Sequence, residues 1–173
     1  MTDMNQIELH KKIEALLLRN PDDIKRDEVL TLISANEDAR QFFFTKADKN
    51  WLDWLWNNAF LDIIKEKSEN PKQISYRMPE LNYLAKVAEQ EPKKVVNIMY
   101  AIPISLENFN PEVIDRFLWI CSILPVKQLK RIISKINDER WVPLMGPFNR
   151  WGFEYEKMFH LLKNFAQGYS LTL

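Results

Sequence analysis

The chain contains few side chains whose type and spacing suit catalysis or metal binding. Its two histidines, His10 and His160, lie far apart in the sequence, and no histidine or cysteine pair has the spacing of a structural zinc site. The single cysteine, Cys121, stands among apolar residues, where a buried thiol behaves as a small hydrophobic group. Glycine occurs only three times, so glycine-rich phosphate-binding loops have no counterpart here. We therefore expect no catalytic residue, no metal ion and no cofactor.

A tryptophan-rich segment, from Trp51 to Trp56, offers binding chemistry instead. On a helix, its apolar side chains cover about 200° of the circumference, given 3.6 residues per turn. Such a helix either packs in an interior or anchors a partner, since tryptophan is favoured at binding hot spots. The preceding run of three phenylalanines cannot face one core, because successive helical residues point about 100° apart. The candidate partner contacts from these segments are Phe43, Trp51, Trp54 and Trp56.

Basic side chains recur at spacings of three and four residues between Lys127 and Lys135. They share one side of a predicted helix, and the candidate contacts there are Lys127, Lys130 and Arg131. Such a ridge binds phosphates or an acidic protein surface, or it is only the solvated side of a surface helix. Residues 125–173 carry eight basic and four acidic side chains, but the whole chain is neutral. Because a nucleic-acid-binding domain is usually basic overall, a nucleic acid is the less favoured partner.

The use of glycine and proline predicts an all-α chain. The first 145 residues contain no glycine, and no long alternating strand pattern is present. Prolines stand where helices should begin, as in Asn110-Pro111-Glu112, which combines a capping side chain, a proline and an acid. The spacing Ser34-Ala35-Asn36-Glu37 similarly predicts a capping box. We predict nine or ten helices, drawn from residues 6–18, 26–34, 36–46, 49–57, 60–68, 79–89, 92–101, 111–123, 125–136 and 154–167.

Two stretches of the chain nearly repeat each other. Pro79-Glu80-Leu81 and Pro111-Glu112-Val113 open runs 32 residues apart, and each run contains a helix, a second proline and another helix. A period of this size is typical of stacked helical hairpins. The first helices match at Leu81, Leu84 and Ala88 against Val113, Arg116 and Ile120, with Arg116 interrupting the apolar pattern. The second helices match after one inserted residue, at Val96, Met99 and Tyr100 against Leu129, Ile132 and Ile133.

Over Trp51–Ile136 the pattern resembles the HEAT and armadillo type of α-helical repeat. The resemblance implies a short α-solenoid of stacked antiparallel hairpins that offers a concave surface to a protein or peptide. The favoured function is a non-catalytic protein-interaction scaffold, and the alternative is a nucleic-acid-binding helical repeat that uses the basic C-terminal third. An enzyme of HEAT-like fold, such as a base-excision glycosylase, is a third hypothesis. Its candidate carboxylate is Asp53, between Trp51 and Trp54.

The sequence also suggests how the chain is organised. We expect a helical repeat body over residues 1–137, then a connector rich in proline and glycine and a C-terminal helix over 138–173. The apolar C-terminal end predicts docking on the body, self-association, or continuation into more repeats of a larger protein. Apolar runs are too short to span a bilayer, and no signal peptide is recognisable. A cytoplasmic location is therefore expected.

Overall fold

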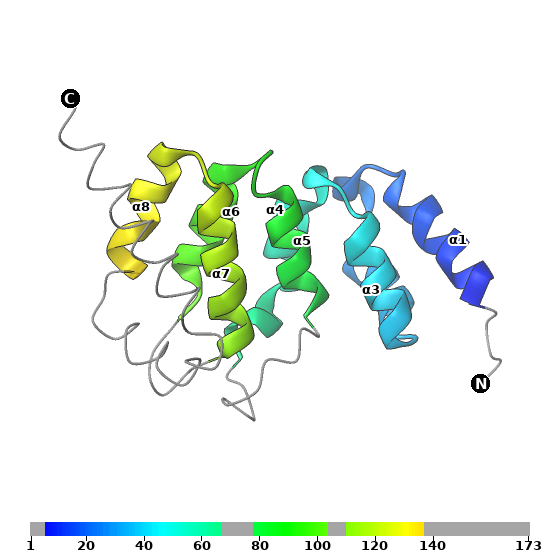
Figure 1. Cartoon of the computed structure of the whole chain (residues 1–173). Coiled ribbons are helices and arrows are strands. Elements are labelled where there is room, and N and C mark those ends of the chain that lie inside the picture. The colour runs from blue at the N-terminus through cyan, green and yellow to red at the C-terminus, as the bar shows by residue number, and fades with distance from the viewer. Residues whose placement is uncertain (1–5, 67–77, 104–109, 137–173) are drawn as a thin grey trace. The chain divides into compact units, whose positions relative to one another are not determined.

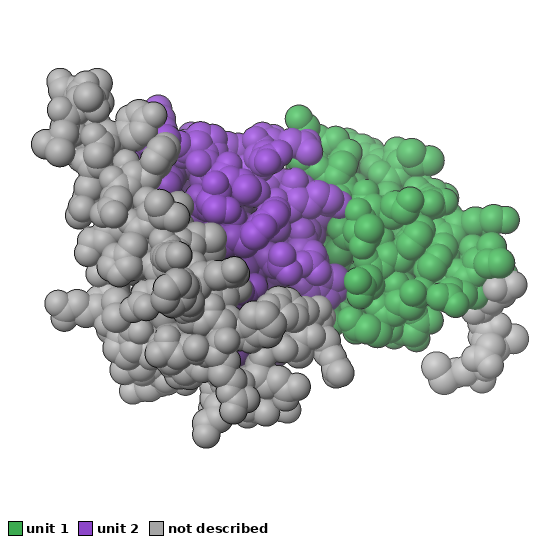
Figure 2. Space-filling view, viewed as in Figure 1, with its two compact units in different colours: residues 1–61 green, residues 62–173 purple. Residues whose placement is uncertain are grey.

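The chain is helical wherever the structure describes it. The computed structural model describes residues 6–66, 78–103 and 110–136, and for residues 133–136 it describes the backbone alone. These ranges hold eight α-helices and three 3₁₀ helices, without a strand, which confirms the all-α fold class (Figure 1). Two compact units divide the chain, residues 1–61 and residues 62–173 (Figure 2). Among the described helices, none has the length and apolar character needed to cross a membrane.

The first unit has three helices that pack on one another. Helix α1 packs against α3, and α2 contacts both of them. Apolar side chains spaced three and four residues apart make the buried side of α1, namely Leu9, Ile13 and Leu16. The elements of the unit are α1 (Gln6–Leu17), η1 (Pro21–Asp23), α2 (Arg26–Ile33), α3 (Glu37–Lys46), η2 (Lys49–Trp51) and α4 (Leu52–Asn57).

In the second unit, each helix packs on the helix two places away in the sequence. Helix α5 packs against α7, α6 packs against α8, and α5 also contacts α6. The odd-numbered α-helices of the unit therefore pack on each other, and so do the even-numbered ones. The elements are η3 (Asp62–Lys65), α5 (Pro79–Val87), α6 (Pro92–Ala101), α7 (Pro111–Ile123) and α8 (Val126–Ile136).

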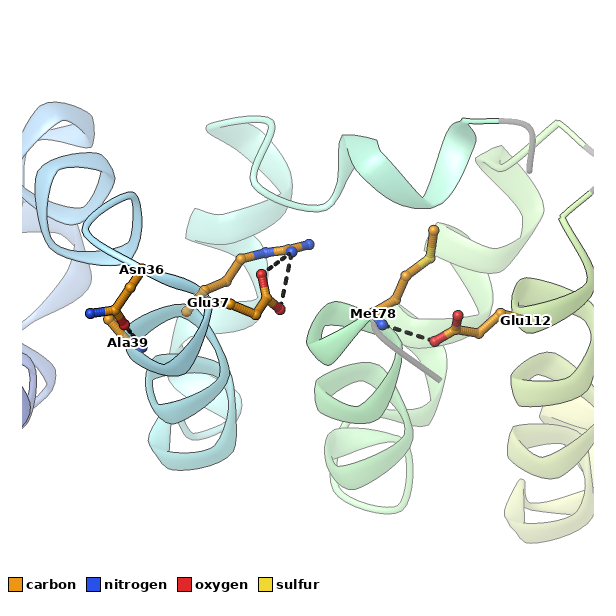
Figure 3. A network of polar contacts seen from close by, with 6 residues as sticks. Asn36, Glu37, Ala39, Met78 and Glu112 are labelled. Carbon is orange, nitrogen blue, oxygen red and sulfur yellow. Dashed lines mark hydrogen bonds and ion pairs between the residues drawn. The ribbon is translucent and has the colours of Figure 1, made fainter. Parts of the chain in front are cut away.

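Prolines begin helices as predicted. Pro79, Pro92 and Pro111 each occupy the first turn of a helix, where the missing backbone N–H has no intrahelical partner to lose. The start at Pro21 forms only a 3₁₀ turn, and α2 begins at Arg26. The predicted capping box at Ser34 is wrong. Asn36 caps α3 instead, since its Oδ1 accepts a hydrogen bond from the Ala39 backbone N–H at 2.8 Å (Figure 3).

Two predicted helices differ from those observed. The helix expected over 49–57 is a 3₁₀ turn followed by α4, and the helix expected over 60–68 is, in its described part, only the 3₁₀ helix η3. A Schellman motif ends α4, because the Phe60 N–H donates to the Leu55 carbonyl and the Ala59 N–H to the Trp56 carbonyl. Phe60 therefore leaves the helix instead of beginning a new one. The predicted helix at 154–167 and the segment 138–173 lie outside the described residues.

Arg116 interrupts the apolar pattern of α7 only when α7 is compared with α5 at a spacing of 32 residues. Beyond their first residues, the buried positions of the two helices correspond at 33 residues, as Leu84 does to Phe117 and Ala88 to Cys121. The same spacing relates Val96 and Met99 to Leu129 and Ile132. One extra residue turns a helical position by about 100°, so Arg116 lies beside the core of α7.

At this spacing, Arg116 corresponds to Tyr83. The Lys86 ammonium lies 5.4 Å from the centre of the Tyr83 ring, and the Arg116 guanidinium lies 5.9 Å from the centre of the Trp119 ring. Corresponding positions on α5 and α7 thus hold a cation–π pair in opposite order. The ring of Tyr83 is buried, whereas Trp119 is 43% exposed.

Buried acids connect the starts of the helices in the second unit. Glu80 and Glu112 hold the second positions of α5 and α7, only 2% and 4% exposed, where the positive helix end favours a carboxylate. Glu112 Oε1 accepts a hydrogen bond from the Met78 backbone N–H at 2.8 Å (Figure 3). The neighbouring Asn110 donates to the Glu66 carbonyl at 3.4 Å. The start of α7 therefore holds the start of α5 and the end of η3.

Replacing Ala59 with glycine should stabilise the protein. Ala59 has φ 64°, a left-handed conformation that costs a residue with a Cβ about 1–2 kcal/mol. Glycine removes this cost, but it adds freedom to the unfolded chain, so the free energy of unfolding should rise by about 0.5–1 kcal/mol. Urea unfolding of the full chain measures the change. As a control, Ala101→Gly at the exposed last residue of α6 should lower stability. A less stable Ala59→Gly variant would contradict the left-handed assignment.

Removing the Glu112 carboxylate should weaken the fold of the second unit. Glu112→Ala leaves the Met78 N–H without its charged acceptor and should lower the free energy of unfolding by about 2–3 kcal/mol. Glu112→Gln keeps an acceptor oxygen and should cost less. Glu89→Ala, at an exposed position in the turn after α5, serves as the control and should change stability by less than about 0.5 kcal/mol. Equal losses for Glu112→Ala and Glu89→Ala, measured by urea unfolding, would contradict this role of Glu112.

Candidate functional site

The aromatic side chains predicted as partner contacts lie in the core of the first unit. Phe43, Trp51 and Trp54 are 0%, 1% and 8% exposed. Their rings meet edge to face, with centroids 5.5 Å apart for Phe43 and Trp51 and 5.4 Å apart for Trp51 and Trp54. This burial favours the packing alternative for these three residues. Trp56 is half-buried, and Asp53 is exposed on α4.

The same aromatic cluster holds the start of α2. Phe60 stacks on Trp54 with ring centroids 5.3 Å apart, and the Arg26 guanidinium lies 5.6 Å from the centre of the Phe60 ring. Arg26 Nε also donates to the Asn58 carbonyl at 3.1 Å. Because each ring contacts the next, these residues join α2 to the end of α4. Their arrangement is structural.

His10 belongs to a polar cluster between α1 and α3. Its Nε2 lies 2.7 Å from Asp38 Oδ2, and its ring stacks on Phe42 at 3.8 Å between centroids. Gln6 Nε2 donates to the same Asp38 oxygen at 2.7 Å. The Gln6 hydrogen bond first, and the His10 contact second, hold the pKa of Asp38 below its usual value. No group of three potential ligands suited to a metal ion occurs within the described ranges.

The chain's only thiol is shielded from solvent. Cys121 is buried in α7, and this burial raises the pKa of its thiol to about 12. At neutral pH the group is therefore a thiol and not the thiolate that nucleophilic chemistry requires. Its position among the apolar side chains of α7 agrees with the packing role expected from the sequence.

A half-buried charged pair lies beside the exposed Trp119 on α7. Asp115 Oδ1 and Arg116 Nε are inaccessible to solvent and have no hydrogen-bond partner. Desolvation raises the pKa of Asp115, against the opposing charge of Arg116. Buried polar atoms without a hydrogen-bond partner lower the free energy of unfolding, so these two side chains destabilise the fold.

The basic residues predicted as contacts lie on the outer side of the second unit. Lys127, Lys130 and Arg131 are all exposed on α8. Helix α6 packs against α8, and its exposed side carries further residues beside these cations. They are spaced four and three residues apart and were not selected from the sequence. We call these six residues the basic face: Lys93, Asn97, Tyr100, Lys127, Lys130 and Arg131.

Arg131 joins the two helices of the basic face. Its Nη2 donates to Asn97 Oδ1 at 2.9 Å, and its Nη1 donates to Gln128 Oε1 at 3.1 Å. Lys93 precedes Asn97 by one helical turn, and Lys127 precedes Arg131 by the same four residues. Both lysines hold the second position of their helix. The first turns of α6 and α8 therefore each carry an exposed lysine.

The lysines of the basic face differ from several others in the chain. Lys12 pairs with Glu8 at 3.0 Å and Lys46 with Glu14 at 3.9 Å. In the described part of the chain, no acidic side chain lies within ion-pair distance of Lys93, Lys127 or Lys130. The sequences of α6 and α8 contain no acid at all. Among the described residues, these three lysines therefore have no carboxylate beside them.

The Asp38 cluster should make stability depend on pH in the acid range. Because the pKa of Asp38 is lowered in the folded state, its ionised form stabilises the protein above the unfolded-state pKa of about 4. This contribution disappears as the pH falls through the folded-state pKa. Asp38→Asn should therefore lower the urea midpoint at about pH 5 and have little effect near pH 2. Gln6→Ala should show a smaller version of the same trend. A constant Asp38→Asn deficit across this range would contradict the assignment.

The basic face can hold an anionic ligand through charge and hydrogen bonds. Two helices supply its cations, and Tyr100, 46% exposed, adds an aromatic surface. Its residues are positioned by the buried contacts between α6 and α8, so the face rests on helices and not on loops. Comparisons of the chain with protein-family models, with curated proteins and with solved structures found no match.

Proposed function

We propose that this protein is a non-catalytic interaction scaffold of helical-repeat type, related in architecture to HEAT repeats, and that it binds another protein. The observation that carries the proposal is the packing of the second unit, in which α5 packs on α7 and α6 packs on α8. Helix pairs that contact their neighbours in this way are the unit of repeat scaffolds. The first unit contributes a related contact, since α1 packs on α3 with α2 beside both.

The outer sides of α6 and α8 form the binding surface in this proposal. Repeat scaffolds bind partners through aligned side chains on equivalent helices, and the basic face combines such side chains from two helices. Tyr100 and Arg131 belong to the residue types that most often dominate protein interfaces. The buried Phe43, Trp51 and Trp54 have no place in this surface.

The alternative function is nucleic-acid binding, and the same basic face supports it. Exposed lysines could neutralise phosphates, and Tyr100 could stack on a base. The zero net charge of the chain argues against it, because long-range attraction to a polyanion grows with net positive charge. We therefore place a protein partner first.

The proposal predicts a specific loss of binding when the basic face is altered. A partner is first isolated on the immobilised full chain and purified, and its dissociation constant is then measured by calorimetry. Tyr100→Ala and Lys130→Ala should each weaken binding by about tenfold, as expected when a residue near the centre of an interface is truncated.

Exposed residues of the first unit provide matched controls. Leu18 is 89% exposed just after α1, and Lys11 is exposed within α1. Leu18→Ala and Lys11→Ala should leave the dissociation constant within about twofold, a change no larger than that of a peripheral contact. A partner that binds all four variants equally well would exclude the basic face, and the absence of any stoichiometric protein complex would refute the scaffold function.

A further inference from the structure

The charges at the second helical positions of the second unit alternate in sign, although Glu91 at the N-cap of α6 pairs with Lys94 at 3.7 Å. The first turns of α5 and α7 contain Glu80 and Glu112, as expected from the positive helix end. The first turns of α6 and α8 contain no acid, and their second positions are Lys93 and Lys127. These lysines add to the positive end of their helices, which destabilises each helix.

The arrangement along α8 is unfavourable for a second reason. Lys127 stands three residues before Lys130 and four residues before Arg131, so like charges are neighbours on one side of the helix. Each such pair of like charges destabilises a helix. No acid on α6 or α8 relieves this repulsion, although acids pair with lysines elsewhere in the chain. The face would be relieved by anionic charge from outside.

The spacing of the cations limits what can supply that charge. Along each helix the positions lie one turn apart, about 5–6 Å, and packed helices lie about 8–10 Å apart. A partner must therefore carry negative charges at one-turn intervals. Acidic residues three and four positions apart on a helix have this repeat, and they would meet the row of cations on α8 and Lys93 on α6.

The remaining residues of the face point to a protein ligand. Tyr100 offers an exposed ring that could pack on the apolar part of a partner helix, and Asn97 offers a polar side chain between the rows. A platform for single-stranded nucleic acid normally stacks several bases on several aromatic rings, but Tyr100 is the single aromatic member of the basic face. Neutral net charge again favours the protein ligand.

From these observations we infer that the basic face of α6 and α8 binds an acidic helix of a partner protein, whose carboxylates lie one turn apart. This inference rests on the proposed scaffold function and identifies the chemistry of its partner. Lys93, Lys127 and Lys130 meet the carboxylates, and Arg131 stays fixed between the helices by Asn97 and Gln128. Tyr100 packs against the apolar side of the acidic helix.

Defined probes test this inference on the full chain. The first is a dye-labelled helical peptide of about 20 residues with glutamates three and four positions apart on one side. The second has the same composition with the glutamates distributed around the helix, and the third replaces glutamate with glutamine. A single-stranded oligothymidine of similar length is the fourth. Anisotropy at about 50 mM salt should give the tightest binding for the first probe, with affinity falling as salt rises.

Charge reversal locates the binding. Lys127→Glu combined with Lys130→Glu should weaken binding of the first peptide by about tenfold or more. Lys11→Glu combined with Lys49→Glu changes the net charge equally at exposed positions of the first unit and should have less than about a twofold effect. Both variants are compared by circular dichroism and thermal unfolding. Because the first removes like-charge repulsion, it should be at least as stable as the natural chain.

Each contrary result overturns a distinct part of the inference. Equal losses for the two double variants would reduce the effect to net charge. Equal binding of the ordered and distributed glutamate peptides would exclude a helical ligand. Tighter binding of oligothymidine, lost in Lys127→Glu/Lys130→Glu, would assign the face to nucleic acid. If the partner isolated for the proposed function still bound that variant, the scaffold would stand and the acidic helix would be refuted.

Discussion

The hydrogen bond from the Met78 N–H to the Glu112 carboxylate links the start of α5 to the first turn of α7, and it satisfies polar groups at both helix starts. Without it, the start of α5 would have a backbone donor unsatisfied and α7 would have a buried charge with one partner fewer. Because α5 packs on α7 and α6 packs on α8, fixing one pair of helices also limits how the other pair can shift. The basic face, which lies on α6 and α8, depends on this register.

Acids and bases thus have different roles at the starts of successive helices. The buried Glu80 and Glu112 stabilise the fold, while the exposed Lys93 and Lys127 oppose the dipole of their own helices. A second unit with acids at all four starts would be more stable, but its outer side would not be positive. The separation places buried acids at the starts of α5 and α7 and exposed lysines at the starts of α6 and α8.

The sequence predicted most of the helices because prolines and capping residues are local signals. Helices α6 and α7 occur with the predicted bounds, and Lys127, Lys130 and Arg131 of α8 are exposed as the periodic pattern suggested. The burial of Trp51 and Trp54 could not be decided, since an apolar arc of that width serves a core or an interface equally well. The left-handed turn at position 59 could not be predicted either, because the residue there is an alanine and not a glycine. Asn97 and Tyr100 could be assigned to the basic face only from the packing of α6 beside α8, because a local sequence pattern does not contain this tertiary contact.

Uncompensated charge on a helix that must also fold sets binding against stability. Lys127 weakens α8 in the free protein through the helix dipole and through Lys130 and Arg131, and both effects are reversed when carboxylates approach. In the proposed complex, the folding free energy given up in the free state would return as part of the binding free energy. The burial of Leu129 and Ile132 permits this, because together with the Arg131–Asn97 hydrogen bond it holds α8 against α6. A helix with a weaker apolar side could not carry three cations within two turns and still present them at fixed positions.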